Sequence, residues 1–383
     1  MIYTVKKGDS LYSIGRAHGL SYVQIAKDNE LSADDELVVG QTIFLNDGQE
    51  EKLGEIIVNG YAFPNITQNV LDRTSPELTY LSIFSYEASA SSPFLKPIND
   101  DTVIKDALSF GVFPALTITN IGKSGGFEAE VAHAIISDEK ASRNVLGAAV
   151  KIMDEKGYHA LNIDFEYLYP EDRENYNSFI LLAEEMVHAT ANRVLMTALA
   201  PKYNANQQGA LYSAHDYNFH GRHVDYVILM TYEWGYAYSE PMSVAPVGEV
   251  KRVLDYAVTE IPSEKILMGI PNYGYNWHIP YSQGEAAAAV GNYDAVRIAR
   301  QNGAEIEYDE KAQTPHFTYY DISGKEERLV YFEDARSIQA KLSLVYDYNL
   351  GGVSYWTINR YFPQNWLVLD AMYDTEKAPR PRI

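Results

Sequence analysis

From Ile56 onward, short apolar segments alternate with stretches long enough to form a helix, and this pattern constrains the fold more than any other feature. Such alternation is typical of parallel strands whose connecting helices cover the sheet. Strands are expected at Ile56–Ala62, Tyr80–Tyr86, Gly111–Thr117, Ala160–Glu166, Arg193–Leu199, Tyr226–Tyr232, Ile266–Pro271 and Gly352–Trp356. The sequence therefore predicts an α/β protein, a (β/α)₈ TIM barrel over residues 56–383, with its active site at the C-terminal ends of the strands.

The fourth expected strand carries a polar row that a barrel strand normally lacks. Its apolar side chains alternate with Asn162, Asp164 and Glu166, which therefore share one face. A parallel strand covered on both sides usually reads as a continuous apolar run. Buried carboxylates are costly unless they are paired or used. The spacing fits a catalytic acid, Glu166, with an electrostatic partner, Asp164. A satisfied buried hydrogen-bond row or a solvated strand face is the alternative.

The segment Tyr158–Tyr169 resembles the strand-four signature of glycoside hydrolase family 18, the chitinase family, written Asp-Gly-x-Asp-x-Asp-x-Glu. Asp164 and Glu166 match its last two acids, whereas Asn162 replaces the first acid of the row and the Asp-Gly pair is absent. The resemblance implies a retaining mechanism in which the substrate's own 2-acetamido oxygen attacks the anomeric carbon. Glu166 is then the general acid and base, Asp164 orients the acetamido N–H, and Asn162 hydrogen-bonds to Asp164.

Three further segments resemble the same family. Leu229–Trp234 is similar to the strand-six Met-x-Tyr-Asp, which implies that Tyr232 donates its hydroxyl to the acetamido carbonyl. Gly351–Trp356 is similar to the strand-eight segment whose tryptophan, here Trp356, forms the floor under the −1 sugar. Gly269–Trp277 is similar to the strand-seven Gly-x-Pro-x-Tyr-Gly. The remaining substrate-binding residues are expected to be Glu233 (where an Asp is usual), Met230, Tyr273, Trp234 and Tyr61; a packing role is the alternative for each tyrosine.

Residues 1–47 read as a small β-α-α-β unit of their own. Its Tyr-x-Val-x-x-Gly-Asp-Ser-Leu start, central Asn-x-Leu and closing Gly-Gln-x-Ile resemble the LysM module, a binder of N-acetylglucosamine-containing glycans. A structural domain without a ligand is the alternative. The polar residues 48–55 are expected to form a linker. The resemblance implies a glycan groove between two loops, with LysM glycan-binding residues Gly8, Asp9, Ser10, Leu11, Asn29 and Leu31.

The stretch 277–332 is too long for one loop between a barrel strand and its helix. Residues 315–332 read as a β-hairpin within it. The stretch resembles the α+β insertion that some family members carry after strand seven, where it forms one wall of the substrate cleft. A helix over 334–348 is expected to return the chain to the last strand.

Composition excludes several classes of partner. The formal net charge of −21 argues against nucleic acid and is compatible with a neutral glycan. No apolar run reaches ~18 residues, so no membrane span is expected. Met1 leads directly into a strand-like segment without the basic and apolar regions of a secretory signal. With no cysteine and no zinc-type histidine motif, neither a metal site nor a cofactor is expected.

Taken together, the motifs most resemble the bacterial branch of family 18 that degrades cortical fragments of spores, N-acetylglucosaminidases that act on peptidoglycan. We therefore expect a monomeric, cell-wall, spore-associated or extracellular hydrolase that cleaves β-1,4 linkages in peptidoglycan. The nearest alternative is a chitinase that uses LysM to hold chitin. An inactive chitinase-like lectin is an alternative of another class, against which the retained Glu166 argues.

Overall fold

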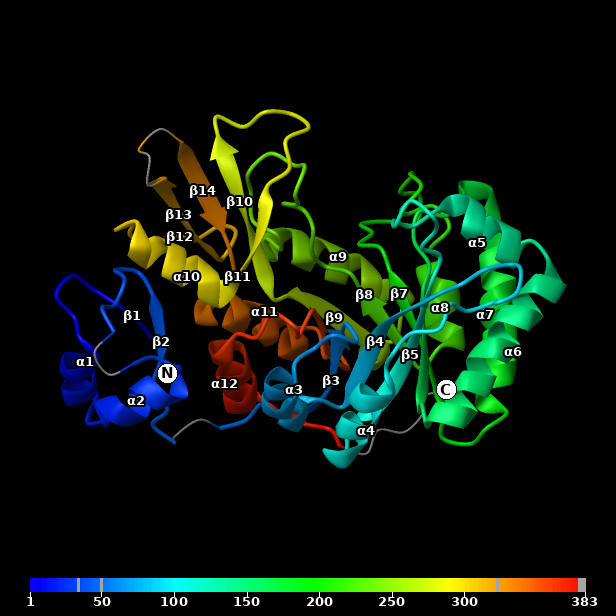
Figure 1. The fold of residues 1–383 in the computed structure, drawn as a ribbon, viewed down its shortest axis with the longest axis horizontal. Coiled ribbons are helices and arrows are strands. Elements are labelled where there is room, and N and C mark those ends of the chain that lie inside the picture. Colours follow the sequence, from blue (N-terminus) through cyan, green and yellow to red (C-terminus); the bar gives the residue numbers. More distant parts are fainter. Residues whose placement is uncertain (33–34, 49–50, 322–323, 325, 378–383) are drawn as a thin grey trace.

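The structure is a computed structural model that describes residues 1–32, 35–48, 51–321, 324 and 326–377 (Figure 1). Residues 49 and 50 of the expected linker therefore lie outside the described residues. The parallel pairing of the last barrel strand with the first closes the sheet and confirms the predicted TIM barrel. Its strands are β3 (Glu55–Ala62), β4 (Tyr80–Glu87), β5 (Phe113–Thr119), β6 (Ala160–Asp164), β7 (Val194–Leu199), β8 (Tyr226–Leu229), β9 (Ile266–Pro271) and β15 (Gly352–Trp356).

Helices surround the strands, and the period-two alternation of each strand sorts its side chains between two cores. Leu161 and Ile163 point outward into the larger core between strands and helices. A smaller core fills the barrel interior and includes Ala160 and Met196. The described helices of the barrel are α3 (Gln68–Thr74), α4 (Asp101–Ser109), α5 (Ala129–Ile136), α6 (Glu139–Lys156), α7 (Arg173–His188), α8 (Tyr217–His223), α9 (Val247–Glu260), α11 (Ala335–Asp347) and α12 (Pro363–Met372).

Three strands differ from their expected limits by two residues or more. β5 begins at Phe113 because Gly111, with a φ of 72°, ends the preceding helix. β8 ends at Leu229 because the amide of Thr231 turns back to the Leu229 carbonyl, 2.8 Å away. β6 ends at Asp164, where its ladder with β5 stops. Glu166 therefore lies on the loop after β6, and Tyr232 lies on the loop after β8.

The insertion is an antiparallel five-stranded sheet with one helix, and it stands beside the barrel (Figure 1). The predicted hairpin is confirmed by the pairing of His316 with Tyr331. The sheet begins at Tyr273, earlier than the expected residue 277, because β10 follows β9 almost directly. Its elements are β10 (Tyr273–Ile279), β11 (Ala288–Gly291), α10 (Asn292–Gln301), β12 (Glu307–Asp309), β13 (Thr314–Tyr320) and β14 (Glu327–Tyr331).

The N-terminal module consists of β1 (Ile2–Thr4), α1 (Leu11–His18), α2 (Tyr22–Asp28) and β2 (Thr42–Phe44). Ser10 caps α1, and its side chain and that of Ser13 satisfy each other's backbone amides. The Asn29 amide joins α2 to β2, because it bonds the carbonyl of Ile25 at 2.9 Å and both backbone groups of Phe44 at 2.7 and 2.8 Å. A small apolar core and these side-chain bonds hold the module together.

The module lies against α10, α11 and α12 at one end of the molecule (Figure 1). The amide nitrogen of Gln364 on α12 donates to Asn29 Oδ1 at 3.0 Å and to the Thr42 carbonyl at 2.7 Å. Its amide oxygen accepts from Thr42 Oγ1 at 2.8 Å. The backbone also makes close contact, since a Cβ on Gly40 would lie 1.8 Å from the carbonyl oxygen of Ile306. The module is therefore docked onto the rest of the protein through buried polar bonds.

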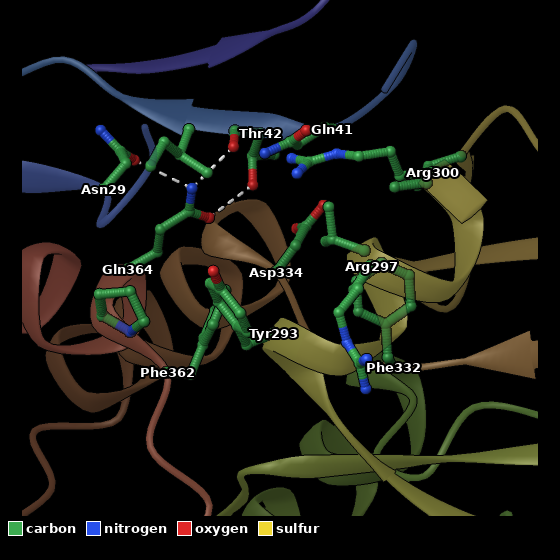
Figure 2. A pocket seen from close by; sticks show the side chains of 14 residues that line it. Asn29, Gln41, Thr42, Tyr293, Arg297, Arg300, Phe332, Asp334, Phe362 and Gln364 are labelled. Carbon is green, nitrogen blue, oxygen red and sulfur yellow. Dashed lines mark hydrogen bonds between the residues drawn. The ribbon is translucent and has the colours of Figure 1, made fainter. Parts of the chain in front are cut away.

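A cavity of about 70 Å³ lies at this junction, lined by the module, the insertion and α12 (Figure 2). Figure 2 shows the Gln364 side chain between Asn29 and Thr42, with its bonds to both. These polar groups satisfy one another across the junction, and apolar side chains such as Phe332 and Phe362 complete the lining. The cavity thus belongs to the contact between the module and the barrel.

Replacing Gln364 by alanine should weaken this contact. The change leaves the Thr42 hydroxyl without its buried partner and removes one of the two donors to Asn29 Oδ1, which costs about 1–3 kcal/mol of unfolding free energy. Denaturant unfolding of the variant measures the loss, and limited proteolysis tests whether the module loosens first. The matched control is Gln339→Ala, which removes an exposed glutamine from α11. Equal stabilities of the two variants would contradict the expectation.

Candidate active site

A cavity of about 460 Å³ opens at the C-terminal ends of the barrel strands. It is the place that the parallel barrel topology assigns to an active site. Side chains at the ends of β6, β7, β8 and β15 and from longer loops meet there. The lining residues are Phe127, Asp164, Glu166, Tyr167, Pro201, Leu211, Tyr212, Met230, Tyr232, Glu233, Trp234, Tyr236 and Trp356.

Asp164 is the last residue of β6 and is only 3% exposed. Burial raises the pKa of its carboxyl from an ordinary 3.8 to about 7, because the ionised form loses hydration. Its Oδ1 has no hydrogen-bond partner among the described residues. Neighbouring Asn162 donates to the Tyr61 hydroxyl at 2.8 Å, and its own Oδ1 is also unpaired. The carboxyl of Asp164, at the end of β6, can therefore change its protonation state near neutral pH.

Glu166 lies two residues further, on the same side of the chain, and its carboxyl borders the cavity. Its pKa is raised well above the ordinary value, first by burial and then by the neighbouring carboxylates of Asp164 and Glu233. A carboxyl with a raised pKa keeps its proton to higher pH than an ordinary glutamate, and it can deliver that proton to a leaving group. This arrangement suits general acid chemistry at Glu166.

The loop after β8 supplies the facing side of the cleft. Tyr232 lines the cavity, and burial together with the Asp164 and Glu166 carboxylates raises its pKa, so its hydroxyl stays protonated and can donate. Glu233 has a φ of 69° and stands more exposed at the rim. Partial loss of hydration beside the cleft raises the pKa of Glu233, whereas hydrogen bonds from Tyr273 and Tyr275 oppose the rise. The Tyr275 hydroxyl lies 3.0 Å from Glu233 Oε1.

An aromatic group forms the floor. Trp356, at the end of β15, packs edge-to-face on Phe84 and Tyr61, with ring centroids 4.9 and 5.2 Å away. Such packing fixes the indole, whose remaining surface lines the cavity. Trp234 is fixed as well, because its ring nitrogen donates to the Tyr203 hydroxyl at 2.7 Å. An apolar floor beneath polar walls suits a sugar ring, which presents C–H groups on its faces and hydroxyls at its edge.

The structure brings most predicted side chains to the cavity and places three behind it. Asn162 and Tyr61 lie beneath the floor, and Tyr273 reaches the cavity only through Glu233. Several aromatic and loop residues of the cavity were not predicted, since no local motif marks where distant loops converge. These unpredicted lining residues are Phe127, Tyr167, Pro201, Leu211, Tyr212 and Tyr236.

The residues predicted to bind glycan in the N-terminal module have mixed surroundings. Leu11 is 1% exposed in the module core, and the Asn29 amide is fully used within the module and by Gln364. Asp9 accepts bonds from the Tyr3 hydroxyl and the Lys6 amide, at 2.7 and 2.8 Å. A side-chain contact of Leu11 or Asn29 with a glycan would need surface that these residues do not expose. Gly8, Ser10 and Leu31 lie at or near the module surface or its junction with the barrel.

Within the described part of the chain, no group of three or more His, Cys, Asp or Glu side chains is arranged to hold a metal ion. Likewise, none of the described helices combines the length and the apolar character needed to span a bilayer.

Comparison with known proteins agrees with this geometry. A family model described as Glycosyl hydrolases family 18 matches residues 116–360, and a LysM domain model matches residues 3–46. The chain is 39% identical to the cortical fragment-lytic enzyme of Bacillus subtilis (strain 168), over 98% of this chain and 99% of that protein. The crystal structure of the Bacillus cereus spore cortex-lytic enzyme SleL superposes with a TM-score of 0.92 at 33% identity, covering 99% of both chains.

A chitinase is a more distant match. The class V chitinase CHIT5 of Lotus japonicus is 21% identical over 66% of this chain and 68% of its own length. The family match therefore spans most of the barrel, and the extended identity spans nearly the whole chain. The chain belongs to glycosyl hydrolases family 18 and carries a LysM domain at its N-terminus.

Proposed function

We propose that this protein cleaves β-1,4 linkages in peptidoglycan, as a retaining N-acetylglucosaminidase that acts on spore cortex or cell wall. The observation that carries the proposal is the pair of carboxyls, buried Asp164 and half-buried Glu166, beside Tyr232 in a single cavity over an indole floor. Burial raises the pKa of both carboxyls, that of Asp164 to about 7, and the Tyr232 hydroxyl adds a neutral donor. This combination supports acid-assisted cleavage of an acetamido sugar.

In the proposed reaction, Glu166 protonates the glycosidic oxygen while the acetamido oxygen of the −1 sugar attacks the anomeric carbon. An oxazolinium ion forms, and its positive charge develops beside Asp164, which orients the acetamido N–H and stabilises that charge. The Tyr232 hydroxyl donates to the acetamido oxygen and holds it in line. Glu166, now ionised, then removes a proton from water. The water oxygen attacks the anomeric carbon and opens the oxazolinium ring, which regenerates the acetamido group with net retention. Asn162 acts indirectly, through Tyr61 and the polarity around Asp164.

Side chains around the two carboxyls would bind the sugars. Trp356 and Met230 form the floor, Trp234 and Glu233 the far wall, and Tyr273 holds Glu233. Glu233 carries one methylene more than the aspartate usual at this place. Its position at the rim, fixed by two tyrosine hydroxyls, allows that longer side chain to reach the sugar edge.

The identity of the polymer rests on the relatives. The protein named cortical fragment-lytic enzyme matches nearly the whole chain at 39% identity, whereas a chitinase matches two thirds of it at 21%. The LysM domain and the family 18 barrel both indicate glycan binding. We propose that both act on the same polymer, that the chain works as a monomer, and that it is located at the spore or cell wall.

Parallel assays on solubilised spore-cortex fragments and on chitin oligosaccharides test the proposal. We expect faster release of products ending in reducing N-acetylglucosamine from the cortex fragments, identified by mass spectrometry. Glu166→Gln protein is the control in both assays, because it keeps the glycan-binding surface. Faster cleavage of chitin would favour the chitinase alternative, and glycan binding without cleavage of either polymer would favour the lectin.

A further inference from the structure

The backbone that carries Glu166 has left the barrel sheet. The ladder between β6 and β7 stops at Ile163, paired with Thr197, and the ladder with β5 stops at Asp164, paired with Thr119. The N–H and C=O groups of the next residues therefore lack strand partners. Because buried backbone groups must be paired, other groups have to serve them. Their partners determine where the Glu166 side chain points.

Asn120, the first residue after β5, provides two of these bonds. Its Oδ1 accepts from the Glu166 amide at 2.9 Å, and its Nδ2 donates to the Glu166 carbonyl at 2.8 Å. The side-chain amide thus provides the acceptor and the donor that a neighbouring strand would otherwise provide. Nδ2 also donates to the Glu128 carbonyl at 3.1 Å, which ties in the loop that carries Phe127 to the cleft. Asn120 is completely buried.

His215, in the segment before α8, provides the third bond from the opposite neighbour of β6. The Ala200 amide donates to His215 Nδ1 at 2.9 Å, which fixes the tautomer with the proton on Nε2. Nε2 lies 3.0 Å from the Phe165 carbonyl and donates to it. Burial lowers the pKa of His215 to about 4, so the imidazole stays neutral at higher pH. The imidazole therefore connects the end of β7 to the peptide between the two acids.

We propose that Asn120 and His215 are positioning residues that together aim the Glu166 carboxyl at the scissile bond. The inference rests on the proposed function of Glu166. Asn120 binds the backbone of Glu166 from the β5 side, and His215 binds the carbonyl of the preceding residue from the β7 side. We call these contacts of Asn120 and His215 the first and the second clamp, and the two together the clamp. The following residue, Tyr167, has a φ of 54° and turns the chain away, so the sheet provides no further support. Neither side chain lines the cavity, so both act through the backbone.

Asn120→Ala tests the first clamp. We expect kcat on a soluble 4-methylumbelliferyl glycoside of chitobiose to fall by about 10²-fold with KM almost unchanged, the scale for a small misplacement of a catalytic group. The matched control is Asn292→Ala, because buried Asn292 similarly accepts from a backbone amide, that of Glu333, at 2.9 Å outside the cleft. Both variants should lose thermal stability, but only Asn120→Ala should lose kcat. Equal kcat values for the two variants would refute the role of Asn120.

His215→Gln and His215→Leu test the second clamp. The glutamine amide can place a donor near the position of Nε2, whereas leucine cannot, so His215→Gln should recover at least part of the kcat lost in His215→Leu. His220 provides the control pair, since it is equally buried, bonds Thr197 Oγ1 at 3.1 Å and is not hydrogen-bonded to residues 165 or 166. The same substitutions at His220 should leave kcat near the wild-type value.

The results separate this inference from the proposed function. If the wild-type protein fails to hydrolyse the glycoside and cortex fragments, the proposed function of Glu166 is wrong. If the wild type is active and the His215 and His220 pairs behave alike, the clamp is wrong while the function stands. A fall in kcat confined to the Asn120 and His215 variants, with rescue by glutamine, supports the clamp.

Discussion

Replacing Glu166 by glutamine should lower kcat by about 10²–10⁴-fold, the range attributed to general acid–base catalysis. The amide has nearly the shape of the carboxyl, so the fold and the affinity for substrate should persist. It cannot donate an acidic proton to the leaving oxygen or later remove one from water. Initial rates on the soluble glycoside measure the effect, and circular dichroism and unfolding midpoints verify the fold.

The dependence of activity on pH should also report the ionisation of Glu166. The first step needs protonated Glu166, so wild-type activity should fall as pH rises through its raised pKa, and Glu166→Gln should lack this alkaline limb. The matched control is Glu171→Gln, the same change at an exposed glutamate beyond the loop after β6. Near-normal rates in Glu166→Gln, or a large loss in Glu171→Gln, would count against the assignment.

Substrates that carry a 2-hydroxyl in place of the 2-acetamido group at the −1 sugar should not be hydrolysed measurably. In the proposed mechanism that acetamido oxygen is the nucleophile, and both Asp164 and Tyr232 serve it. A thiazoline analogue of the oxazolinium ion should conversely inhibit strongly, as ligands that resemble a transition state do. Matched pairs of glycosides with the same leaving group measure the first effect, and competition kinetics measure the second.

Glu233 is an alternative nucleophile to the acetamido group of the substrate. Glu233 lines the same cavity as Glu166 and raises its pKa, so a covalent intermediate on Glu233 is the alternative to participation by the substrate. Its bonds with Tyr273 and Tyr275 hold it at the rim. Mass spectrometry of the enzyme during turnover distinguishes the two. A glycosyl adduct on Glu233 would overturn the substrate-assisted mechanism and leave the role of Glu166 untouched.

The barrel could be predicted from the sequence because each strand is a short apolar run separated from the next by helix-length segments. The ends of the strands were harder, since an apolar or alternating pattern continues beyond the last ladder bond. At β6 the pattern continues to Glu166, but the structure replaces the ladder there with the Asn120 side chain. Alternation in sequence reports the direction of a side chain and not the partner of its backbone.

The chemical centre of the site followed from local motifs, whereas its surroundings did not. Asp164, Glu166 and Tyr232 lie in recognisable segments, and the structure places all three in one cavity. Tyr212 and Phe127 reach that cavity from loops whose paths depend on tertiary contacts. His215 lies 50 positions from the carbonyl it binds, and no spacing rule connects such residues. Buried positioning side chains of this kind become visible only when the backbone partners are traced.

The docking of the LysM module through Gln364 and Gly40 has a consequence for how this enzyme would meet a long polymer. A binding module on a flexible linker raises the effective concentration of the glycosidic bonds near its binding site, and this concentration varies smoothly with the length of the linker. A module fixed to the barrel instead sets one separation and one angle between the two sugar-binding surfaces. A single glycan strand could bind both surfaces only if its sugars are spaced to fit this separation. The fixed geometry would therefore select which bond of the strand lies in the active site.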